Sequence, residues 1–163
     1  MKKNIFIKCA FFLFLLNFIF SCKVYALDIK LLDLRDKIFK EANQIKQNIG
    51  PKNQDFVLLS GLFDSCILAV HQIDAYFYMV GIFELIRKED VNKTSFNFLF
   101  SWLNIMRKTN NLNLQSVENA GLPTEGETKN YLMRIKSYFK ELDKQITQEQ
   151  ERLNILMRVM KIK

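Results

Sequence analysis

The stretch YLMRIKSYFKELDKQITQEQERLNILMRVM, residues 131–160, decides the fold of this 163-residue chain. Its apolar residues recur at alternating steps of three and four, the spacing that keeps side chains on one side of an α-helix. Eight of the nine seam positions are apolar; the set is Leu132, Ile135, Phe139, Leu142, Ile146, Glu149, Leu153, Leu156 and Met160. The pattern predicts a long amphipathic helix that packs along its length against other helices.

A second pattern marks the beginning of this helix. Thr124 and Glu127 follow Pro123 with the spacing of a capping box, in which two side chains bond free backbone N–H groups of the first turn. If the helix continues to Lys163, it extends about 54 Å. Its other faces are rich in lysine, arginine and glutamate, as expected for a surface in water.

The preceding segment begins near Val91 and is dense in aromatic residues. Its periodicity is ambiguous, and aromatic side chains also suit β-strands. A single strand over residues 95–103 would have no partner, so we expect a helix. We expect this helix to weaken at residues 109–111, where a threonine and two asparagines follow one another, because these are poor helix formers.

The segment from about residue 53 to 89 has no lysine or arginine between Asp55 and Ile86. It is apolar on most sides, which predicts a helix buried on several faces. Polar residues fall on one stripe of this helix, namely Ser60, Asp64, His71, Asp74 and Tyr78. A membrane span is the competing interpretation, but its charged residues would then lie in the middle of the span without a basic partner, which is costly.

The first helical segment runs from about Asp28 to Asn48 and ends before the Gly50-Pro51 pair. Helices joined by short loops favour antiparallel neighbours. We therefore predict an all-α fold, an elongated antiparallel (up-down) bundle of about four helices. We expect the second helix to lie mostly inside and the fourth to cover it. Residues 27–163 would form this single helical-bundle domain.

Residues 1–26 have the features of a secretory signal peptide. Two lysines near the start precede an apolar run from Cys9 to Phe20. As a helix this run is about 18 Å long, short of the roughly 30 Å hydrocarbon core of a membrane. Cleavage after Ala26 suits ordinary signal peptidase. An uncleaved N-terminal anchor is the alternative.

The end of the leader also resembles a bacterial lipobox. In that case Cys22 is the lipidation candidate and residues 1–21 form the signal. Both cleavage sites predict an exported protein of the periplasm or cell envelope. Membrane contact is then expected only through the signal or a lipid anchor.

The formal net charge of +7 belongs largely to this leader. Residues 1–26 hold four lysines and no acidic residue, so 20 basic and 17 acidic residues remain, a net charge of +3. Removal of residues 1–21 instead leaves a net charge of +4. A charge this small predicts no nucleic-acid partner.

Residues with catalytic or metal-binding chemistry are few. The sequence has no glycine-rich phosphate loop, no nucleophile elbow and no H-E-x-x-H motif. Cys66 and His71 lie about 140° apart around a helix and so do not face each other. Asp64, His71 and Asp74 share one side, where a carboxylate beside an imidazole can bind a ligand or a metal. We expect this stripe to face solvent or a groove, with a buried polar seam or a ligand site as alternatives.

The sequence therefore predicts no catalytic residue, no metal site and no cofactor. We expect an exported, non-enzymatic helical bundle of the bacterial cell envelope that acts through protein–protein contacts. Its partner would be another protein or a second copy, bound through a helical seam. The alternative is a periplasmic binding module for a small apolar ligand or a metal, centred on the polar stripe and aromatic middle of the second helix.

Overall fold

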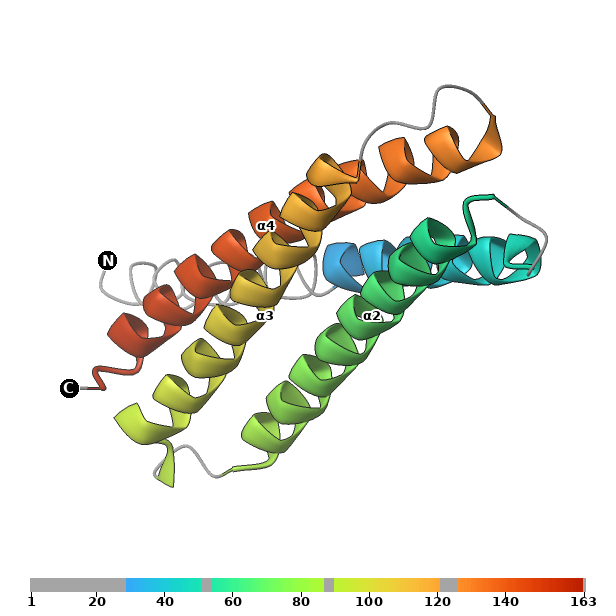
Figure 1. The fold of residues 1–163 in the computed structure, drawn as a ribbon. Helices are drawn as coiled ribbons and strands as arrows, with labels where there is room; N and C mark the ends of the chain where they lie inside the picture. The colour runs from blue at the N-terminus through green and yellow to red at the C-terminus, as the bar shows by residue number, and fades with distance from the viewer. Residues whose placement is uncertain (1–28, 51–53, 87–89, 121–125, 163) are drawn as a thin grey trace, which may run out of the picture.

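A computed structural model describes residues 29–50, 54–86, 90–120 and 126–162, and it has the predicted all-α architecture (Figure 1). The 29–48 helix, named by its residue range, comes first. It is followed by α2 (Phe56–Leu85), α3 (Lys93–Asn119) and α4 (Glu127–Val159). Residues 1–28, which include the predicted signal peptide and Cys22, lie outside the described residues.

The helices form an elongated antiparallel bundle. Helices α2, α3 and α4 run alternately up and down, and the 29–48 helix lies across one end of α2 and α4 (Figure 1). Polar contacts tie this first helix to both neighbours. Arg35 bonds Asp74 of α2, and Arg134 of α4 donates to the buried Glu41 at 2.8 Å. The first helix therefore covers only part of the length of α2.

The seam of α4 packs against other helices, as its spacing predicted. Seven of the nine seam positions, from Leu132 to Leu153, are at most 2% exposed, and the last two are half-buried. Phe139 and Ile146 are fully buried. These side chains face the chain's own helices, so the predicted use of this seam for a second copy finds no free surface in the described residues.

Glu149, the polar exception on the seam, is buried with partners. The Tyr76 hydroxyl of α2 donates to its carboxylate, and Arg152 Nε donates to Oε2 at 2.7 Å. Burial of the phenol and the neighbouring carboxylate raise the pKa of Tyr76 well above its ordinary value. A polar link between α2 and α4 thus lies inside an otherwise apolar core.

Three details of the prediction were wrong. First, α2 is not mostly inside, because only about a third of its most apolar stretch is buried. Second, α3 continues through residues 109–111, since the buried Asn110 donates to the Phe139 carbonyl at 2.8 Å and so gains a tertiary partner. Third, the N-cap of α4 is Gly126 at a φ of 96°, which glycine adopts readily, and not Thr124. Thr124 itself lies outside the described residues.

Candidate functional site

The polar residues predicted on the second helix lie on its outer side. Asp64 and His71 are exposed, and Asp74 is half-buried. The structure therefore places this stripe toward solvent and not in a polar seam inside the bundle. Among the described residues, no hydrogen bond or ion pair joins His71 to Asp74. The three side chains share a helix face without forming one cluster.

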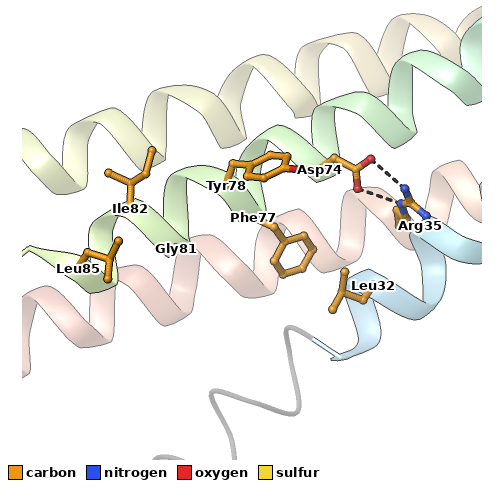
Figure 2. A pocket seen from close by; sticks show the side chains of 8 residues that line it. All are labelled: Leu32, Arg35, Asp74, Phe77, Tyr78, Gly81, Ile82 and Leu85. Carbon is orange, nitrogen blue, oxygen red and sulfur yellow. Dashed lines mark hydrogen bonds and ion pairs between the residues drawn. The ribbon is translucent and has the colours of Figure 1, made fainter.

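Asp74 is engaged by the first helix. Arg35 donates from Nε to Oδ1 at 2.9 Å and from its second terminal nitrogen to Oδ2 at 3.0 Å, a two-pronged pair (Figure 2). The hydrogen bonds to Asp74 and Asp36 raise the pKa of Arg35, so its charge persists. Both carboxylate oxygens of Asp74 thus hold the 29–48 helix against α2.

Cys66 is separate from this outer side. The thiol is fully buried, whereas His71 is exposed, which agrees with the angle between them on the helix. Burial, with a contribution from Glu41, raises the pKa of Cys66 to about 12. The thiol stays protonated near neutral pH and is a poor nucleophile. Within the described residues, no group of three or more His, Cys, Asp or Glu residues is arranged to hold a metal ion.

The outer side of α2 carries a longer pattern that the sequence reasoning missed. Nine residues recur at alternating steps of four and three over four heptads; we call them the α2 stripe, which consists of Val57, Gly61, Asp64, Leu68, His71, Ala75, Tyr78, Ile82 and Leu85. All are exposed except Ala75, which is half-buried. The spacing alone could have revealed the stripe, but α2 is apolar on so many sides that only its polar members were noticed.

The exposure of large side chains on the α2 stripe is high. Val57 is 82% exposed, Tyr78 77% and Leu85 85%. Scattered single apolar residues are ordinary on protein surfaces, but large apolar side chains that gather on one helix face, as at Tyr78, Ile82 and Leu85, indicate an interaction surface. The stripe has the spacing with which one helix packs against another.

An open groove of about 610 Å³ flanks the C-terminal half of the stripe. It lies between α2 and the start of the 29–48 helix (Figure 2). Its lining is mostly apolar and consists of Leu32, Arg35, Asp74, Phe77, Tyr78, Gly81, Ile82 and Leu85. Among the described residues, Leu32 and Arg35 of the 29–48 helix form one edge of the groove and α2 forms the other (Figure 2).

By length and composition, α2 is also the one helix among the described residues that could cross a membrane. The α2 stripe sets Asp64 and His71 in the middle of that helix, which has no lysine or arginine to neutralise Asp64. Lipid contact along the stripe would therefore place polar groups in the hydrocarbon region, where they are costly. A protein surface accommodates such groups more easily.

Comparisons of this chain with protein-family models, with curated proteins and with solved structures gave no match.

Proposed function

We propose that this chain is an exported, non-enzymatic helical-bundle protein of the bacterial cell envelope that acts through protein–protein contacts. The observation that carries the proposal is the exposed α2 stripe, which covers four heptads and holds five large apolar side chains, those of Val57, Leu68, Tyr78, Ile82 and Leu85. Burial of such a line against another helix removes apolar surface from water and stabilises a complex. The groove beside it extends the same surface onto the 29–48 helix.

Contact through the stripe is tested by photo-crosslinking in intact cells. A benzophenone amino acid at position 78, which is 77% exposed on the stripe, should yield a discrete protein adduct. The same amino acid at position 133 is the control, because Met133 is 50% exposed on α4. Absence of any protein adduct specific to position 78 would contradict the proposal.

Export is tested separately by fractionation and N-terminal sequencing. The leader features support a mature chain that begins at Leu27 or at a lipidated Cys22. The protein should appear in the periplasmic or envelope fraction. Cys22→Ser should abolish lipid labelling if the second site is used and leave processing unchanged if the first is used. An unprocessed chain in the cytosol would refute export.

A second candidate function is the binding of a small apolar ligand in the groove, favoured by its volume of about 610 Å³ and apolar lining. The groove is open along the helix surface, whereas small-molecule sites bury most of their ligand. A metal at the polar stripe has less support, since Asp74 is paired with Arg35. Native mass spectrometry of the purified protein distinguishes a bound small molecule from an empty groove.

A further inference from the structure

We infer that the partner of the α2 stripe is a second copy of this chain, with the two α2 helices packed antiparallel. This inference deepens the proposed function and rests on it. The α4 seam is already buried in the monomer. The α2 stripe covers four heptads of the described surface, whereas the exposed apolar residues Phe98, Ile105 and Leu112 of α3 cover two. The sizes and charges along the stripe decide between a parallel and an antiparallel pair.

A parallel pair in register would match each residue with itself. Gly61 would face Gly61 and leave a void, while the two Tyr78 rings would compete for the same space. The two Asp64 carboxylates would also meet in one layer, where like charges repel. A parallel arrangement therefore conflicts with the stripe in both shape and charge.

An antiparallel pair removes these conflicts. In antiparallel coiled coils the two kinds of seam position face one another, and the longest overlap sets Gly61 opposite Tyr78 of the second copy. The small residue then makes room for the large ring. In the same register Val57 lies opposite Ile82, so an apolar layer closes each end of the pair. Leu68 lies opposite His71 at the centre.

Charges also favour this register. Asp64 lies opposite Ala75 of the second copy, whose small side chain leaves space, and one helical turn from that copy's His71, which can hydrogen-bond the carboxylate. The two Asp64 residues are separated by 11 residues of rise, about 16 Å, which exceeds the Debye length in physiological salt of about 8 Å. No lysine or arginine lies on α2 to oppose the contact.

The pair would also cover the groove. Ile82 lines it, and Val57 of the second copy lies over Ile82 in this register. Val57 is 82% exposed in the single chain and would lose most of that exposure. The start of the 29–48 helix, with Leu32 at the groove edge, would thus become part of the interface.

Ile82→Lys tests the interface in the protein as isolated from cells. The side chain at position 82 is 64% exposed, so the lysine should leave the fold intact. In sedimentation analysis we expect the wild type to be dimeric and Ile82→Lys to dissociate about 100-fold more readily. Met133→Lys is the matched control, a change to lysine at a 50% exposed apolar position of α4, and it should stay dimeric.

Engineered cysteines test direction and register. Gly61 tolerates a side chain, because an added Cβ would meet nothing within 4 Å, and Tyr78 is exposed. The double variant Gly61→Cys/Tyr78→Cys should form an interchain disulfide on oxidation. Neither Gly61→Cys nor Tyr78→Cys alone should form this disulfide. In a parallel pair, each single variant would form one, because each residue would face itself. Gly61→Cys/Leu85→Cys reports a register shifted by one heptad and should also stay unlinked.

The outcomes separate this inference from the proposed function. A monomeric wild type, or linkage of the single cysteine variants, overturns the antiparallel pair. If the position-78 adduct contains a different protein and the chain is monomeric, the proposed function stands and the inference fails. Flotation of the monomeric chain with phosphatidylcholine vesicles, lost in Ile82→Lys, would instead assign the stripe to a lipid surface and overturn both.

Discussion

Two heptad patterns of similar length run along this molecule, the seam of α4 and the α2 stripe. The first is buried and forms the core, and the second is largely exposed. Both have steps of three and four, so spacing alone does not say whether a helix face packs inside the chain or outside it. The remaining faces decide: α4 carries charges on its other sides and therefore has one apolar face to bury, whereas α2 is apolar on most sides and has more than its neighbours can cover.

The largest effect should come from truncation in the α4 seam. Phe139 is fully buried, and Phe139→Ala should lower the free energy of unfolding by about 3 to 5 kcal/mol, because it leaves a cavity. Ile82→Ala on the α2 stripe removes a side chain that is 64% exposed and should cost less than about 0.5 kcal/mol in the monomer. Urea denaturation measures both. Equal losses would refute the contrast between the two patterns.

A smaller loss is expected from Glu149→Ala, which removes the polar member of the buried seam. Tyr76 then loses its buried acceptor and Arg152 its carboxylate, at a cost of about 2 to 3 kcal/mol. Glu151→Ala is the matched control, since Glu151 is exposed, and it should change stability by at most about 0.5 kcal/mol. Thermal unfolding of the two variants measures the difference. Equal unfolding midpoints would contradict a stabilising role for the buried Glu149.

The same cluster predicts loss of stability in alkali. The pKa of Tyr76 is raised above its ordinary value of 10.0, so the unfolded chain ionises this phenol while the folded chain keeps it neutral. The contribution of this phenol to the free energy of unfolding is therefore fully present below pH 10. Above pH 10 it falls by up to about 1.4 kcal/mol per pH unit. The buried thiol of Cys66, with its pKa raised from 9.0 to about 12, acts in the same direction from pH 9 upward.

Denaturant titrations between pH 8 and 12 check this dependence. Tyr76→Phe should be less stable at pH 8, because it lacks the hydrogen bond to Glu149, but its stability should fall less steeply above pH 10. Tyr78→Phe alters a phenol that is 77% exposed on the α2 stripe and should keep the wild-type slope. Identical slopes for wild type and Tyr76→Phe would exclude the buried phenol as the cause.

The smallest effect is expected beside the stripe. Asp74→Asn weakens the pair with Arg35. The Asp74 side chain is 32% exposed and that of Arg35 27%, so the change should lower the free energy of unfolding by at most about 1 kcal/mol, and by less in high salt. Chemical denaturation at low and high ionic strength measures the difference. A loss comparable to that of Glu149→Ala would mean that the outer pair, and not the buried cluster, carries the larger polar contribution.

The sequence was sufficient to predict the architecture and the buried seam, because each rests on local spacing and on short connections. The places where it failed depend on distant contacts. Asn110 stabilises α3 through a carbonyl of α4, and the N-cap of α4 depends on a glycine conformation that a capping pattern does not show. The ion pair between Arg35 and Asp74 joins residues 39 positions apart.

Only the polar part of the candidate surface could be predicted from the sequence, for a related reason. Asp64 and His71 were recognised because polar residues stand out in an apolar helix, and their exposure agrees with the expected outward stripe. Val57, Leu68 and Ile82 look like core residues from sequence. Their exposure depends on which sides of α2 the other helices cover, and no pattern within α2 specifies that.

Glu149 has a consequence for the alignment of α4. A seam of uniform aliphatic residues can slide by one heptad, about 10 Å, and still bury the same kind of side chain. With a carboxylate at one position, such a slide would separate Glu149 from the Tyr76 hydroxyl and leave a buried donor and a buried acceptor without their shared hydrogen bond, which is unfavourable. The single irregular residue in the repeat therefore distinguishes one arrangement of α4 against α2 from its shifted neighbours, and it makes the native packing unique where the repeat alone would allow several.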